Sequence, residues 1–224
     1  AATIGGTAFF LDFTSNNVAA FQLGSLSISG NSIGTAGNRT AADGIFLGLA
    51  SGFGGTQNVT IASNAIFAGD GGANTDEAIF VEIDSGVYQF AFANNQLSVD
   101  GNASPQEALL FDADSANDPT VTITQFSGNT FGAGNEGGLT FLGSVSGAGN
   151  ALLTFDATPG GAYQSVNAGS MVIGTTGARV SGDGLSLTNV QGILSFDDLD
   201  IANDGGFGIE VEHAILETKL YFDA

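Results

Sequence analysis

Four carboxylates have the spacing best suited to chemistry. Glu82 and Asp84 lie in or just after one apolar segment, and Asp112 and Asp114 hold the same places in a similar segment further on. If both segments are neighbouring β-strands, alternate residues share a face, so all four carboxylates project from one side of a sheet. Like charges placed side by side repel each other, and Ca²⁺ relieves such repulsion through oxygen ligands. These four residues are therefore candidate Ca²⁺ ligands.

The same carboxylates raise the alternative of a polysaccharide-active enzyme, because glycoside hydrolases work with two acidic residues at a set separation. Asp197 with Asp200 offers another such pair, but a chain with 23 acidic residues provides pairs by chance. A lyase needs a basic group near the acids, and Arg39, Arg179, Lys219 and His213 all lie away from them. His213 has no His or Cys partner, and no nucleophile elbow is present. We assign no catalytic residue.

A second candidate site is apolar. Four residues occupy one position of a repeated segment, and alternation turns that position outward: Phe10, Phe46, Phe80 and Leu110. Thr140 continues the column. An exposed apolar column of this size indicates a contact surface for a second copy, another domain or a ligand. The alternative is that the loops at 34–43, 67–77 and 99–107 fold over the column.

The elements that position these residues repeat along the chain. A six-residue pattern of a small residue followed by apolar residues begins at residues 8, 44, 78, 108 and 138, at steps of 36, 34, 30 and 30. A repeat of this size is typical of a solenoid, in which each turn buries its apolar face against the next. Ile79, Val81 and Ile83 are then expected to stack beside Ile45, Leu47 and Leu49, with Leu109, Phe111 and Ala113 on the other side.

A second repeat runs between the copies of the first: a short strand, a turn with Asn, and another short strand. The Asn residues occupy equivalent turns, where they tolerate left-handed backbone and can bond along the stack: Asn31, Asn64, Asn95 and Asn129. No segment of ten or more residues has clean helical spacing, and the 35 Gly disfavour helix.

These repeats predict an all-β fold: a right-handed parallel β-helix of about seven turns of ~30–34 residues. We expect one domain over 1–224, with an N-terminal turn at 1–25 and regular turns at 26–150. Irregular turns follow at 151–192, where residues 151–155 are expected to form a strand of the six-residue type. The last turn and a terminal strand or cap occupy 193–224.

The net charge of the chain limits the classes of molecule that it is expected to bind. Asp and Glu number 23 against 3 Lys and Arg, a net charge of −20, which disfavours nucleic acids and anionic membranes. The hydrophobic content of 43% is too high for a disordered acidic tail. No membrane-spanning apolar segment is present, so we expect no membrane insertion. The composition is typical of a secreted or cell-surface bacterial protein, and the start at Ala1 without Met suggests a processed or excised piece.

One unit carries a motif pair of a known class. Phe126 to Asn129 reads FSGN and is followed by Gly137-Gly138-Leu139. The pair resembles the FxxN and GGA-I/L/V repeats of right-handed β-helix surface proteins of bacteria, such as polymorphic outer-membrane proteins, autotransporter passengers and large adhesins. The other units carry ISGN, IASN and FANN instead. The resemblance implies a β-helix exposed on or released from a cell, and it transfers no catalytic residue.

The predicted function is therefore non-enzymatic. The chain is expected to be a structural or adhesive segment that contacts a protein or a carbohydrate, or that self-associates. The alternatives are the polysaccharide-active hydrolase or lyase and a self-assembling filament or phage-type component, because the ends of a solenoid expose unpaired strands. No cofactor other than Ca²⁺ is expected.

Overall fold

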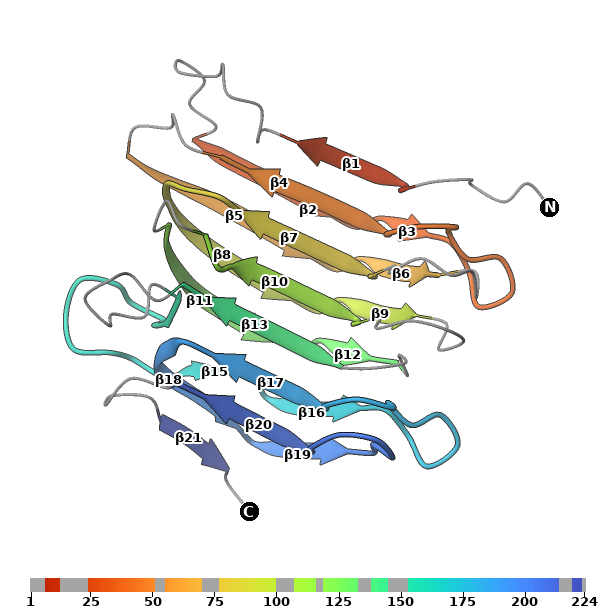
Figure 1. Cartoon of the computed structure of the whole chain (residues 1–224). Helices are drawn as coiled ribbons and strands as arrows, with labels where there is room; N and C mark the ends of the chain where they lie inside the picture. The colour runs from red at the N-terminus through yellow and green to blue at the C-terminus, as the bar shows by residue number, and fades with distance from the viewer. Residues whose placement is uncertain are drawn as a thin grey trace.

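The chain folds as an all-β parallel solenoid. The computed structural model describes residues 7–12, 24–50, 55–69, 77–99, 107–115, 119–132, 138–144, 153–213 and 219–222, and these contain strands and no helix. The strands form three parallel sheets that run the length of the molecule (Figure 1). Within the described residues there is thus no helix that would be long and apolar enough to cross a membrane.

The first sheet faces the viewer in Figure 1 and contains seven strands. Its strands, in spatial order, are β1 (Phe9–Asp12), β4 (Ile45–Leu49), β7 (Ile79–Ile83), β10 (Leu109–Ala113), β13 (Leu139–Gly143), β17 (Leu185–Thr188) and β20 (Ile209–Glu212). The first five coincide with the five predicted copies of the six-residue pattern. Each pairs in parallel with the strand one turn away.

The other two sheets arise from the segments between these copies. The second contains β2 (Ser25–Ser29), β5 (Thr56–Ala62), β8 (Val87–Ala93), β11 (Thr120–Ser127), β14 (Leu153–Phe155), β15 (Val166–Asn167), β18 (Val190–Phe196) and β21 (Lys219–Phe222). The third contains β3 (Ser32–Ile33), β6 (Ala65–Ala68), β9 (Gln96–Val99), β12 (Thr130–Phe131), β16 (Ser170–Ile173) and β19 (Asp198–Ile201). The chain visits the second, third and first sheets in turn, so like strands are one repeat apart.

About three turns are regular, fewer than the seven that the sequence predicted. Strands β2 to β4, β5 to β7 and β8 to β10 repeat with continuous register in all three sheets. The register then shifts between Ile123 and Gln125 of β11. In the next turn a loop at 157–165 separates β14 from β15, and both strands pair with β18. After this interruption, β15 to β17 pair in parallel with β18 to β20 in the same three sheets.

The position of β14 corrects one prediction. Residues 153–155 pair with Val121 to Ile123 of β11, so β14 belongs to the second sheet and not to the first. The pattern of residues 151–155 could not separate the two, because both sheets bury alternate apolar residues. Strand β21 is the terminal strand expected after residue 214, and it pairs in parallel with β18.

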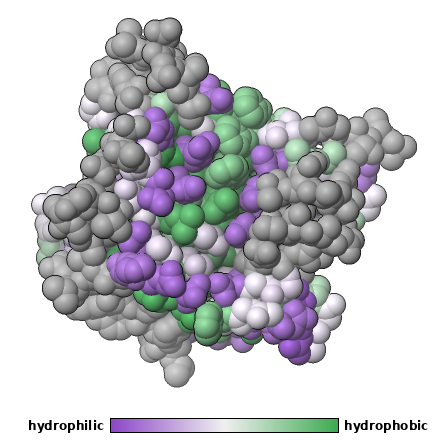
Figure 2. All heavy atoms as spheres, viewed as in Figure 1, coloured by the Kyte–Doolittle hydropathy of each residue, from purple (hydrophilic) through white to green (hydrophobic). Residues whose placement is uncertain are grey.

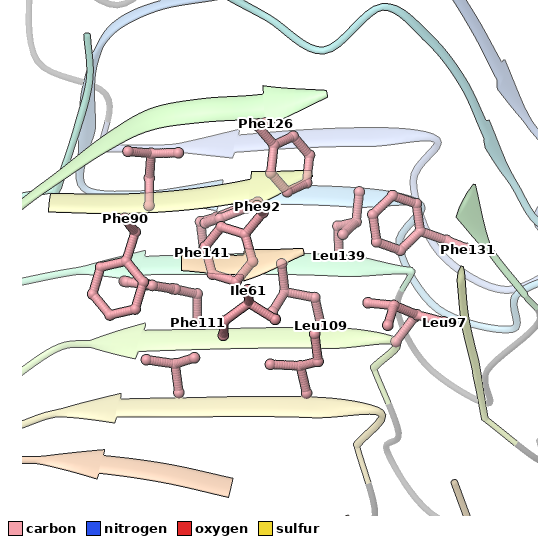
Figure 3. Close-up of a cluster of buried hydrophobic side chains, with 14 of the residues drawn as sticks. Ile61, Phe90, Phe92, Leu97, Leu109, Phe111, Phe126, Phe131, Leu139 and Phe141 are labelled. Atoms are coloured by element: carbon pink, nitrogen blue, oxygen red, sulfur yellow. The ribbon is translucent and has the colours of Figure 1, made fainter. Parts of the chain in front are cut away.

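The core lies between the three sheets and follows the predicted alternation. Ile79 pairs with Ile45, Val81 with Leu47, and Ile83 with Leu49, and all six side chains are buried. Aromatic rings fill the middle of the solenoid (Figure 3). The Phe90 and Phe111 ring centroids are 4.9 Å apart in an edge-to-face arrangement, and those of Phe126 and Phe141 are 5.4 Å apart. Edge-to-face pairs add to the stabilisation from burying the rings.

A ladder of Asn side chains connects successive turns where the second sheet meets the third. Asn64 Nδ2 donates to Asn95 Oδ1 at 3.0 Å, and Asn95 Nδ2 donates to Asn129 Oδ1 at 2.9 Å. Each amide also caps a backbone carbonyl, as Asn95 Nδ2 does for Ile61 at 2.8 Å. The predicted stacking of Asn is thus confirmed. Left-handed backbone occurs one residue earlier than expected, for example at Asn94 with φ 55°.

We expect Asn95→Ala to destabilise the fold by about 2–3 kcal/mol, because it leaves two buried donors of Asn64 and the Ile61 carbonyl without their side-chain partner. Asn31→Ala is the matched control, since Asn31 lies at the exposed end of the same ladder and should cost at most about 1 kcal/mol. Urea unfolding of both variants measures the difference. Equal costs would show that the ladder adds no stability beyond its individual bonds.

Candidate functional site

The apolar column lies on the outer face of the first sheet. Phe10 pairs with Phe46, Phe46 with Phe80, and Phe80 with Leu110, in the register that the sequence predicted. Thr140 is next in the column. These residues alternate with buried core residues, which turns their side chains away from the solenoid interior. We call Phe10, Phe46, Phe80 and Leu110 the apolar ladder.

The ladder is partly open to solvent. Phe10 is 63% exposed, whereas Phe46, Phe80 and Leu110 are half-buried. Phe10 stacks on Phe46 with ring centroids 5.0 Å apart, and Phe46 meets Phe80 edge to face at 5.3 Å. Apolar side chains gather near the middle of this face, with hydrophilic side chains beside them (Figure 2). The alternative was that loops cover the ladder; of those loops, residues 70–76 and 100–106 lie outside the described residues.

A row of acidic residues borders the ladder, and the sequence reasoning missed it. Asp43, Glu77 and Glu107 each lie three residues before a ladder residue, and together with the ladder they line a groove of about 490 Å³. Asp43 Oδ1 accepts the backbone N–H of Glu77 at 3.0 Å, and its Oδ2 accepts the Thr7 hydroxyl at 3.5 Å. The signal was present in the sequence: an acidic residue at a constant distance before Phe46, Phe80 and Leu110.

The four predicted carboxylates also come together on this sheet. Glu82 pairs with Asp112 on the neighbouring strand, and all four line a small hollow of about 170 Å³: Glu82, Asp84, Asp112 and Asp114. Asp112 Oδ1 accepts the Asp114 N–H at 2.8 Å, and Asp84 Oδ1 accepts the Ser115 hydroxyl at 2.7 Å. Local hydrogen bonds thus occupy part of the acceptor capacity of this cluster.

Burial and crowding raise the pKa of two of these groups. Burial raises the pKa of Glu82, and the negative charges of Asp112, Asp12 and Asp84 raise it further. Burial also raises the pKa of Asp112; the hydrogen bond from the Asp114 N–H opposes that rise and the Asp114 charge adds to it. Both effects come from desolvation and like-charge repulsion.

The calcium site stays a prediction. The described residues contain no group of three or more His, Cys, Asp or Glu side chains placed to share one metal ion. No basic residue of the described chain borders the hollow, so the proton acceptor that a lyase needs has no candidate there. Among the described residues, Ile83 and Ser115 line the hollow together with the four carboxylates.

The remaining candidates have structural positions. His213 follows β20 with φ 49°, away from the acidic hollow in sequence and structure. The Arg39 guanidinium donates to the carbonyls of Ala68 and Ser98 at 3.1 and 3.0 Å, and so ties together two turns. Arg179 donates to the Asn203 carbonyl at 3.3 Å.

Both arginines lie in copies of one loop, a repeat that the sequence reasoning also missed. Residues 34–47 and 174–187 share a Gly-Thr start, a later Arg and an Asp-Gly before the strand. Each loop closes with an antiparallel bridge, Thr35 to Asn38 and Thr175 to Ala178. The loops therefore have the same structural role in two different turns.

Comparison with known proteins adds no assignment, since no protein-family model, no curated protein and no solved structure matches this chain.

We expect Glu82→Gln to raise the stability near pH 7 by about 0.2–1 kcal/mol, the range for removing a like-charge cross-strand pair. A raised folded-state pKa means that the folded chain binds more protons than the unfolded chain, so the stability contributed by Glu82 falls as pH rises through that window. The gain should therefore vanish below the ordinary pKa of 4.5. Thermal unfolding across this pH range, with Glu212→Gln as the control, measures it; a gain that does not change with pH would contradict the assignment.

Proposed function

We propose that this chain is a non-enzymatic, structural or adhesive β-solenoid whose apolar ladder is a contact surface. The observation that supports this most is the register that stacks Phe10, Phe46 and Phe80 on the outer face of one sheet. A solvated ladder of aromatic rings has an unfavourable free energy that a partner relieves by covering it. The groove beside the ladder gives that partner a concave surface.

The finer features of this proposal extend the fold. We propose that the coil is right-handed, because parallel crossover connections are right-handed in about 98% of cases. We also propose that the chain acts outside the cell or on its surface, as do the autotransporter-type and adhesin-type β-helix proteins that its FSGN and Gly-Gly-Leu motifs resemble. The partner is a protein or a carbohydrate.

Charge separates this proposal from two others. A net charge of −20 with only 3 basic residues disfavours nucleic acid as a partner. Side-by-side association of two copies through the groove would bring two acidic rims together, which repulsion opposes. Filament growth through the ends of the solenoid does not require the ladder. Mutation of the ladder should therefore abolish binding to a partner but leave end-to-end filament growth unchanged.

The test uses beads that display the protein, offered to surfaces coated with neutral and anionic polysaccharides and with proteins. We expect retention on at least one surface, and we expect Phe46→Ser with Phe80→Ser to lower it by about tenfold or more, because two large apolar contacts are removed. Val172→Ser is the control, since Val172 is 41% exposed on the third sheet.

The same experiment addresses the alternatives. If a soluble polysaccharide is shortened, with or without Ca²⁺, the protein is an enzyme and the adhesive function is wrong. Glu82 and Asp112 would then be the residues to mutate. Retention that survives the double ladder variant would remove the ladder as the contact surface. Light scattering of the wild-type chain then reports whether the protein self-associates instead of binding a partner through the ladder.

A further inference from the structure

The polar side chains of the ladder groove share one chemical property. All three belong to acids, Asp43, Glu77 and Glu107, and an ionised carboxylate accepts hydrogen bonds but donates none. The other lining residues are Phe10, Phe46, Phe80 and Leu110, which neither donate nor accept. Among the described residues, the lining of the groove thus presents acceptors and aromatic surface, without side-chain donors.

We propose, building on the contact role of the ladder, that this groove binds an extended basic peptide segment through arginine side chains. A guanidinium has five N–H donors and no acceptor, which complements a groove whose polar side chains only accept. A sugar hydroxyl both donates and accepts, so a neutral polysaccharide would find no side-chain donor for its acceptors among the described lining residues. The lining of the groove therefore favours a cationic peptide over a neutral glycan.

The aromatic rings favour arginine over lysine. A planar guanidinium stacks on an aromatic face and can contact a carboxylate with two parallel hydrogen bonds, whereas an ammonium acts as a point charge. Phe46 and Phe80 lie on consecutive strands, and Asp43, Glu77 and Glu107 each precede a strand of the ladder. Glu77 is buried, so the carboxylates beside the rings that reach solvent are those of Asp43 and Glu107. A segment that runs from Asp43 to Glu107 crosses two strand spacings of about 4.8 Å each, over the rings of Phe46 and Phe80.

The basic segment lies outside this sequence. The chain has only three basic residues. Arg39 bonds to the Ala68 and Ser98 carbonyls and Arg179 to the Asn203 carbonyl, and neither lines the groove. The net charge of −20 adds a long-range field that attracts a cationic segment and repels a second copy of this chain.

The experiment measures the affinity of a fluorescent peptide that alternates Arg and Gly, by anisotropy at constant salt. Two peptides of the same length serve as comparisons: one with Lys, and one with citrulline, which keeps the shape of Arg but is neutral. The groove variant is Asp43→Asn with Glu107→Gln. The control is Asp198→Asn with Asp200→Asn, which removes the same charge from exposed positions of β19.

We expect the Arg peptide to bind more tightly than the Lys peptide, and the citrulline peptide to bind about tenfold more weakly or worse. The groove variant should weaken binding of the Arg peptide by about tenfold, and the control by less than about twofold. Equal losses in the two variants would reduce the effect to net charge and overturn the proposal. So would tighter binding of a chitosan oligosaccharide than of the Arg peptide.

The variant Phe46→Ser with Phe80→Ser separates this inference from the contact role. If the citrulline peptide binds as well as the Arg peptide and both are lost in the ladder variant, the ladder is a contact surface and the cationic specificity is wrong. If the ladder variant leaves binding of every peptide unchanged, the contact role of the ladder fails as well. Thermal unfolding of each variant checks that the fold is intact.

Discussion

Parallel stacking at one strand spacing is the constraint on which the rest of this molecule depends. Because each strand pairs with the strand one repeat away, a residue type chosen at one position lies about 4.8 Å from the same choice in the next turn. Inside the solenoid this produces columns such as Ile45, Ile79 and Leu109, all buried. Outside, it produces the apolar ladder and the pairing of Glu82 with Asp112. Stability and surface chemistry thus follow from the same register.

Whether a column of stacked side chains stabilises the fold or leaves an unsatisfied surface depends on the chemistry of those side chains. Asn carries both a donor and an acceptor, so Asn64, Asn95 and Asn129 satisfy one another in a buried ladder. Carboxylates carry only acceptors when ionised, so Glu82 beside Asp112 gives repulsion and a raised pKa for Glu82. Phe gains stacking contacts but leaves apolar surface in water. Only the Asn column is satisfied by its own members, and the other two are where partners are expected.

The repeat made the sheet register readable from the sequence, because side chains alternate strictly and the apolar pattern recurs. Ile79 was therefore expected beside Ile45, and Phe80 beside Phe46, as found. The sheet to which β14 belongs was not readable, since Leu153 and Phe155 would be buried in either sheet. Left-handed backbone was expected at Asn95 and occurs at Asn94, because the Asn side chain is needed for the ladder and the sharp turn falls to its neighbour.

The acidic row beside the ladder could not be predicted from alternation, for a different reason. Asp43, Glu77 and Glu107 precede the strands, where alternation no longer tells which way a side chain points. Only the fold shows that the turn into each strand brings the carboxylate back alongside the ladder. Once the register is known, their constant distance from the ladder residue is enough to find them, because the turns before β4, β7 and β10 bring their carboxylates to the same groove. Function in a solenoid is therefore better sought in columns of equivalent positions, loops included, than in motifs along a single turn.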